Sequence, residues 1–142
     1  MGNPFVHIEL SADDVAAAKK FYKSVFDWKL KDVSGPYTMI DVGKGTGGGM
    51  AGKQMPTQPT MWLPYVEVTD VKKTIAKAKS AGANVLVEYM PIGDMGAIGV
   101  FVDPQGAPLG VWEMAKKAAP AKRSAAKKTA KKAKVAKKKG KR

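Results

Sequence analysis

Residues 7–10, His7-Ile8-Glu9-Leu10, have a counterpart 58 positions later in Tyr65-Val66-Glu67-Val68. In both stretches aliphatic side chains alternate with polar or aromatic ones. This is the two-residue period of a strand that turns one face toward a core. The sequence therefore predicts two equivalent strands that begin the two halves of a duplicated fold.

A helix is predicted after each of these strands. Ser11 is a suitable N-cap for the first helix, whose apolar residues recur at helical spacing from Val15 to Val25. The second helix is predicted over Asp70–Ala81, with Gly82 just beyond its C-terminus. Three strands should follow each helix, so each half reads βαβββ. They are 28–33, 37–42 and 48–52 in the first half, and 84–89, 98–102 and 109–114 in the second.

Composition sets the predicted domain boundaries. Residues 54–60 contain two prolines and should link module one (1–53) to module two (61–114). Together the modules form one predicted domain over 1–114, which is long enough for a real core. Residues 115–142 are rich in Lys and Ala and lack core-forming side chains, so we expect a disordered tail.

The formal net charge of +13 is divided unevenly along the chain. Residues 1–114 hold 11 Lys and 12 acidic residues, whereas residues 115–142 hold 14 Lys and Arg and no acid. The absence of Cys excludes disulfides and Cys-ligated metal sites. No apolar run approaches the ~20 residues of a membrane span, and we expect a cytoplasmic protein.

Several stretches of the body resemble the vicinal oxygen chelate superfamily of glyoxalases, bleomycin resistance proteins and extradiol dioxygenases. They are His7-Ile8-Glu9-Leu10, Asp14-Val15, Phe21-Tyr22, Phe26-Asp27-Trp28, Asp103-Pro104-Gln105-Gly106 and Gly110-Val111-Trp112-Glu113. The resemblance covers nearly all of residues 4–114. It implies an α+β fold in which two βαβββ modules form a curved mixed sheet around a cavity. It also implies a homodimer, with modules paired within one chain or exchanged between two.

The resemblance further implies where a divalent metal (Zn, Ni, Mn or Fe) would bind. Family ligands lie on the first and last strands of each module. The matching positions here hold His7, a small residue near Ala51 or Gly52, Tyr65 and Glu113. Of these, His7 and Glu113 are good ligands, so the family's set is incomplete. A two-His-one-carboxylate iron site needs a second His, which the chain lacks, so extradiol dioxygenase activity is not expected.

Three interpretations of these residues stay open. His7 and Glu113 are wall residues satisfied by hydrogen bonds, or they hold a metal in an oxygen-rich site, or His7 works with Glu9 or Glu113 in acid–base catalysis without a metal. If the protein is an enzyme, a lyase of the glyoxalase-like class is the expected type. Strand alternation predicts that a bound small molecule would contact Phe5, Leu63, Tyr65, Glu67 and Val111, and that Trp112 points away from the cavity.

The tail resembles the Lys/Ala/Pro-rich arms of linker histones in composition. Such a polycation is expected to bind DNA or RNA non-specifically through phosphates and to associate with the nucleoid. The residues expected to contact nucleic acid are Lys122, Arg123, Lys127, Lys128, Lys131, Lys132, Lys137, Lys138 and Lys139. The sequence thus supports two functions. The protein binds or transforms a small molecule in its cavity, or it is a non-enzymatic nucleoid-associated adaptor that uses the fold for dimerisation or ligand sensing.

Overall fold

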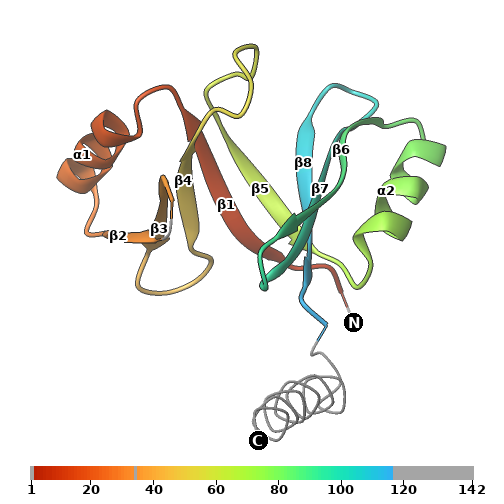
Figure 1. The fold of residues 1–142 in the computed structure, drawn as a ribbon, viewed down its shortest axis with the longest axis horizontal. Helices are drawn as coiled ribbons and strands as arrows, with labels where there is room; N and C mark the ends of the chain where they lie inside the picture. The colour runs from red at the N-terminus through yellow and green to blue at the C-terminus, as the bar shows by residue number, and fades with distance from the viewer. Residues whose placement is uncertain (1, 34, 117–142) are drawn as a thin grey trace, which may run out of the picture.

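The computed structural model describes residues 2–33 and 35–116, which form one eight-stranded sheet and two helices (Figure 1). The nine residues named above as nucleic-acid contacts lie outside these described residues. The elements are β1 (Phe5–Ala12), α1 (Val15–Val25), β2 (Lys29–Val33), β3 (Tyr37–Asp41), β4 (Gly48–Gly52), β5 (Met61–Glu67), α2 (Val71–Ser80), β6 (Asn84–Ile92), β7 (Gly96–Val102) and β8 (Pro108–Met114). This order confirms the predicted βαβββ repeat.

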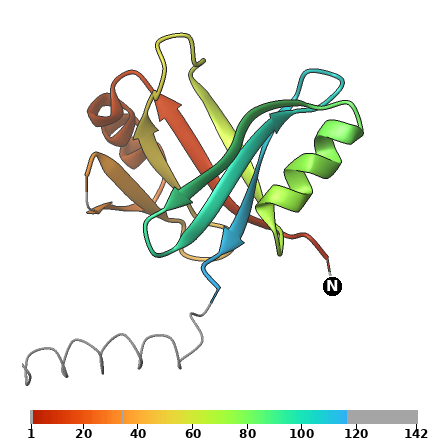
Figure 2. The same ribbon diagram turned by 45° about the vertical axis from the view of Figure 1, so that its right-hand side comes forward.

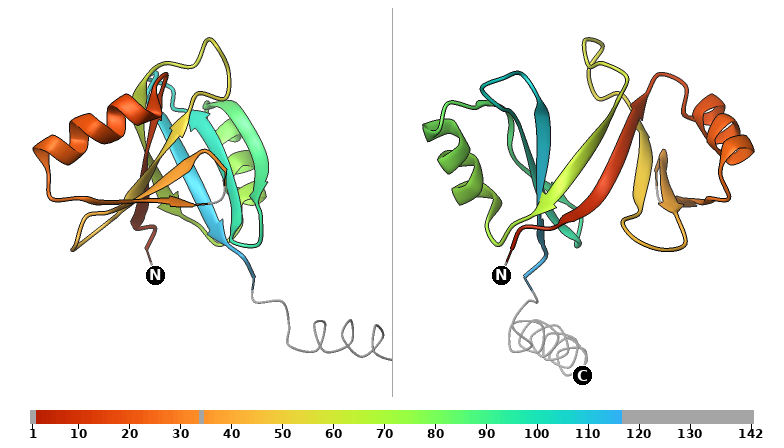
Figure 3. Two further views of the ribbon diagram at one scale, coloured as in Figure 1. Left: turned by 60° about the vertical axis from the view of Figure 1, so that its left-hand side comes forward. Right: turned by 180° about the vertical axis from the view of Figure 1, so that it is seen from behind.

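The two modules join through their first strands. The sheet order is β2-β3-β4-β1-β5-β8-β7-β6, so β1 and β5 are neighbours at its centre and run antiparallel. Within the modules, β1 runs parallel to β4, and β5 runs parallel to β8. The predicted curved mixed sheet is therefore confirmed, and the two modules of this chain pair with each other (Figure 3).

The helix α1 covers the outer side of the half of the sheet formed by module one, and α2 covers the outer side of the half formed by module two (Figures 1 and 2). Under α1, buried Leu10, Ile40 and Met50 form one core. Buried Val71 and Ile75 of α2 pack with Val111 of β8 to form the other. Side chains alternate between the two faces of a sheet along each strand. Since the core residues point to the helices on the outer side, their immediate neighbours in each strand point to the inner side.

The helix starts differ from one prediction and agree with the other. Ser11 is not the N-cap of α1, because β1 continues to Ala12 and Ser11 is buried within it. Asp14 caps α1 instead, and its carboxylate accepts a 2.9 Å hydrogen bond from the Ala17 backbone N–H. Asp70 caps α2 in the same way, accepting from Lys73 N–H at 3.0 Å. In both helices an Asp side chain thus accepts a hydrogen bond from the backbone N–H three residues later, a group that has no partner within the helix.

The end of α2 follows the prediction. The helix ends at Ser80, Ala81 is its C-cap, and Gly82 follows with a φ of 103°. The backbone of a residue with a side chain is strained at this left-handed φ, so glycine suits the position. No helix in residues 2–33 and 35–116 is long and apolar enough to cross a membrane.

Candidate active site

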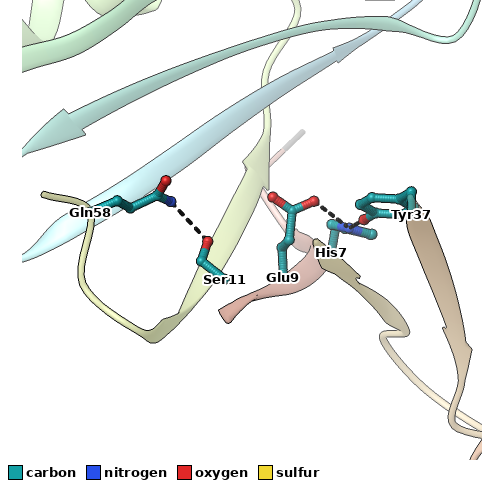
Figure 4. Close-up of polar contacts among 5 residues, drawn as sticks. All are labelled: His7, Glu9, Ser11, Tyr37 and Gln58. Atoms are coloured by element: carbon teal, nitrogen blue, oxygen red, sulfur yellow. Dashed lines mark hydrogen bonds and ion pairs between the residues drawn. The ribbon is translucent and has the colours of Figure 1, made fainter. Parts of the chain in front are cut away.

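Four side chains from three strands meet on the inner face of the sheet. His7 and Glu9 lie two residues apart on β1, and His7 pairs in register with Tyr65 of β5. The His7 Nε2 atom lies 2.7 Å from the Tyr37 hydroxyl and 3.9 Å from Glu9 Oε1 (Figure 4). The His7 ring meets the Tyr65 ring edge to face, with centroids 5.8 Å apart. We call His7, Glu9, Tyr37 and Tyr65 the inner cluster.

Two glycines make room for the tyrosines of this cluster. Tyr37 belongs to β3, and β4 lies between β3 and β1. A Cβ atom at Gly49 of β4 would overlap the Tyr37 hydroxyl, and one at Gly110 of β8 would overlap the Tyr65 ring. A mid-strand glycine often marks such a close approach. Tyr37 therefore reaches His7 by crossing β4 above the bare backbone of Gly49.

Both tyrosines hold their protons firmly. Burial, together with the nearby Glu9 carboxylate, raises the pKa of Tyr37 far above its ordinary value. The same two causes raise the pKa of Tyr65. At neutral pH both phenols are therefore protonated and can donate a hydrogen bond.

The inner cluster can move protons. His7 and Glu9 are partly exposed, with 28% and 24% of their side-chain surface accessible, so both can meet a ligand. Which of His7 and Tyr37 donates in their hydrogen bond depends on the imidazole tautomer. An imidazole and a carboxylate beside protonated phenols supply a base, a counter-charge and donors to a developing oxyanion.

Of the other residues predicted to contact a ligand, some lie on this face of the sheet and others do not. Leu63 pairs with Glu9, and Glu67 shares its strand face with Tyr65, so both lie on the inner side. Phe5 does not follow the alternation, because a register shift between Phe5 and His7 interrupts the pairing of β1 with β5. Phe5 instead lies opposite Val66 and is 59% exposed.

The placement of β8 reverses the prediction. Val111 is 3% exposed and packs with Val71 and Ile75 on the helix side of the sheet. Since successive side chains alternate, Glu113 shares the face of Val111, and Trp112 lies on the inner side. Val111 therefore does not line the inner face, and Glu113 is not grouped with His7.

The residues do not fit the four-ligand metal that the family pattern implies. Among residues 2–33 and 35–116, no three His, Asp or Glu side chains are gathered as a metal ion would need. His7 and Glu9 offer two donors, and the other two members of the cluster are tyrosines rather than further imidazoles or carboxylates. With Glu113 on the opposite face, the pair His7–Glu113 cannot close the set.

The sequence interpretation missed Tyr37, which lies 30 positions from His7 along the chain. The available signal was Gly49, a mid-strand glycine that indicates an approaching side chain without naming it. A second contact, between Gln58 of the predicted linker and Ser11, is also visible in Figure 4. The Gln58 amide donates a hydrogen bond of 2.9 Å to the Ser11 hydroxyl. This bond joins the linker to β1 near the end of that strand.

Two named relatives share part of the sequence. The chain is 32% identical over 116 residues to a protein named "Putative glyoxylase CFP32" of Mycobacterium tuberculosis, covering 75% of this chain and 44% of that protein. It is 28% identical over 122 residues to the anthracycline biosynthesis protein DnrV of Streptomyces peucetius, covering 73% and 44%. The chain thus spans under half the length of these relatives.

Solved structures agree on the fold. The hypothetical protein BH1468 of Bacillus halodurans C-125 superposes with a TM-score of 0.61 at 14% identity, over 83% of this chain and 99% of that one. Methylmalonyl-CoA epimerase of Mycobacterium tuberculosis superposes with a TM-score of 0.57 at 14% identity, over 80% and 89%. At these identities the likeness concerns the fold alone. The model of one family matches residues 5–111, and the chain belongs to that family, the Glyoxalase/Bleomycin resistance protein/Dioxygenase superfamily.

Proposed function

We propose that the inner face binds a small carbonyl compound and that His7 and Glu9 transfer a proton on it without a metal. The observation that carries this proposal is the position of His7 Nε2, 2.7 Å from the Tyr37 hydroxyl and 3.9 Å from Glu9 Oε1. It supports the third interpretation of the sequence, acid–base chemistry by a lone imidazole beside a carboxylate. Glu9 rather than Glu113 is the carboxylate that accompanies His7.

The proposed step is a proton transfer next to a carbonyl group. His7 takes the proton from the carbon beside the carbonyl. The electron pair of that C–H bond forms a carbon–carbon double bond, and the π pair of the carbonyl group moves onto its oxygen. The protonated phenols of Tyr37 and Tyr65 donate hydrogen bonds to the resulting oxyanion. His7 then returns the proton to the former carbonyl carbon, while the hydroxyl proton on the first carbon passes to the oxyanion as that hydroxyl becomes the new carbonyl. The reaction is therefore an isomerisation with no redox partner. Glu9 stabilises the imidazolium that exists between the two transfers.

The family of the chain and the name "Putative glyoxylase" of the mycobacterial relative support a glyoxalase-like reaction. The substrate we propose for it is a hemithioacetal of a 2-oxoaldehyde and a thiol. Such a compound has a C–H bond beside a carbonyl, and its isomerisation gives a thioester of a 2-hydroxy acid. We therefore propose a glyoxalase-like lyase activity for the inner cluster.

The test is solvent deuterium exchange with the full chain. The hemithioacetal of methylglyoxal and glutathione is incubated in D₂O, and NMR follows deuterium incorporation and thioester formation. We expect turnover that falls by about 10²–10⁴-fold in His7→Gln and Glu9→Gln, the range that general acid–base catalysis contributes. Glu88→Gln, on the exposed edge strand β6, is the matched control and should retain full turnover. Turnover in the His7 variant equal to that of the native chain would refute the proposal.

A second function is supported by the charge of the tail. We propose that residues 115–142, with 14 basic residues and no acid, hold the protein on DNA or RNA and thereby on the nucleoid. The alternative of a non-enzymatic adaptor shares this tether. It differs in that the inner face would bind a ligand without turnover.

The expected homodimer is also a proposal. It is supported by exposed apolar side chains on and just after α1, where Phe21 is 59%, Val25 53% and Phe26 46% exposed. Burying such residues between two copies would be favourable. Sedimentation of the native chain and of a Phe21→Ser/Val25→Ser variant tests it, because a dimer on this surface should dissociate in the variant.

A further inference from the structure

A pocket of about 340 Å³ lies where α1 begins and where β3 and β4 meet their loops. It is lined by Val15, Pro36, Tyr37, Ala51, Gly52, Lys53 and Gln54. This volume suits a small molecule. Tyr37 connects the pocket to the inner cluster, because it lines the pocket while its hydroxyl meets His7.

The pocket walls are mostly apolar, and the polar side chains among them are Tyr37, Lys53 just after β4, and Gln54. Val15, Pro36 and Ala51 supply hydrocarbon surface, and the Lys53 side chain is only 17% exposed. A Cβ atom at Gly52 would find no atom within 4 Å, so the pocket is hollow at that point. A ligand here would therefore place an apolar body beside the partly buried Lys53 side chain.

The present partner of Lys53 can be replaced. Its Nζ atom lies 2.9 Å from Asp13 Oδ1, and the Asp13 side chain is 78% exposed. An ion pair with an exposed carboxylate contributes little, since water solvates the free carboxylate well. A ligand carboxylate entering the pocket can take the place of Asp13, which then turns into solvent.

From these contacts we infer that the pocket binds the carboxylate of a small apolar acid, aromatic or short-chain aliphatic, with Lys53 as its counter-ion. A single cation in mostly apolar walls matches a monocarboxylate, whereas a phosphate group calls for several charged donors. The inference rests on the proposed function in one respect. It assigns to the substrate of the inner cluster an anionic group that sits on the far side of Tyr37.

The probe for this pocket is benzoate, titrated into the full chain and followed by calorimetry and by NMR shifts. Benzamide, which has the same shape without charge, is the ligand control. We expect saturable benzoate binding that weakens at least about tenfold in Lys53→Met, as removal of a charge-assisted hydrogen bond predicts. Lys53→Arg should restore most of the affinity. Lys44→Met, on an exposed turn, should bind benzoate like the native chain.

Gly52→Leu provides a second test that leaves the charge in place. Its side chain enters open space, so the variant should fold and yet lose benzoate binding by occupying the pocket. Circular dichroism checks the fold of each variant. Lack of saturable benzoate binding, equal binding of benzamide, or unchanged affinity in Lys53→Met would each overturn the inference.

His7→Gln separates this inference from the proposed function. The variant should bind benzoate with native affinity while losing proton transfer, because His7 does not line the pocket. If benzoate binding fails while deuterium exchange persists, the pocket assignment is wrong and the proton transfer stands. If benzoate binds but the hemithioacetal shows no deuterium exchange, the proposed reaction is wrong and the pocket assignment stands.

Discussion

The Nε2 atom of His7 lies 2.7 Å from the hydroxyl of Tyr37, although one complete strand separates the two residues in the sheet. The contact exists because Gly49 on that intervening strand carries no side chain. The geometry of the proposed base is thus set by a glycine that itself has no chemical role.

Gly49→Ala should displace the Tyr37 ring and break the hydrogen bond between the Tyr37 hydroxyl and His7. A methyl group forced into a packed site costs about 1–3 kcal/mol, so the free energy of unfolding should fall by that amount. Urea denaturation measures the change, and deuterium exchange measures the loss of turnover. Gly52→Ala is the matched control, since its methyl group meets nothing within 4 Å. Equal stability of the two variants would contradict the proposed role of Gly49.

Alkaline pH should destabilise the protein through Tyr37 and Tyr65. Both have a pKa raised above the ordinary value of 10, mainly by burial. Above that pH the unfolded chain releases these protons while the folded chain keeps them, so the free energy of unfolding is intact below pH 10 and falls above it. Denaturant unfolding at neutral pH and above pH 10 measures this fall. Tyr37→Phe and Tyr65→Phe should each make it smaller, and an unchanged fall in both would contradict the prediction.

The position of β8 can be tested on Val111. If it packs under α2, Val111→Ala should remove buried contacts with Val71 and Ile75 and lower the free energy of unfolding by about 2 kcal/mol. Chemical denaturation measures the loss, and turnover by the folded fraction should stay at the native level. A stable variant with lost turnover would return Val111 to the inner face.

The sequence was sufficient for the architecture because local patterns determine it. The alternation around His7 and its repeat at Tyr65 predict two strands of equal role, and the structure pairs those two residues directly. The order of helices and strands was likewise readable from periodicity and turn residues. The sequence also predicts Glu9 as a candidate, because it shares the strand face of His7.

The errors occur where register, a property of strand pairing, decides the outcome. The shift between Phe5 and His7 cannot be read from β1 alone, because it exists in the pairing with β5. Val111 and Trp112 alternate as expected, but which of them faces the helix depends on how β8 aligns with β5. Tyr37 could not be predicted because its contact with His7 crosses a strand between them.

The basic tail should make nucleic-acid binding strongly dependent on salt. Neutralising ~6–8 phosphates gives a slope of about −5 to −7 in a plot of log K against log salt on duplex DNA. The slope is measured by fluorescence anisotropy of labelled duplexes of two unrelated sequences, which should bind alike because the tail has no aromatic residue and two Arg. Replacing the nine residues Lys122, Arg123, Lys127, Lys128, Lys131, Lys132, Lys137, Lys138 and Lys139 with Gln should remove most of the binding. The same number of substitutions among the Lys residues of 1–114 should leave it intact. Equal loss in both variants would mean that the body rather than the tail holds the nucleic acid.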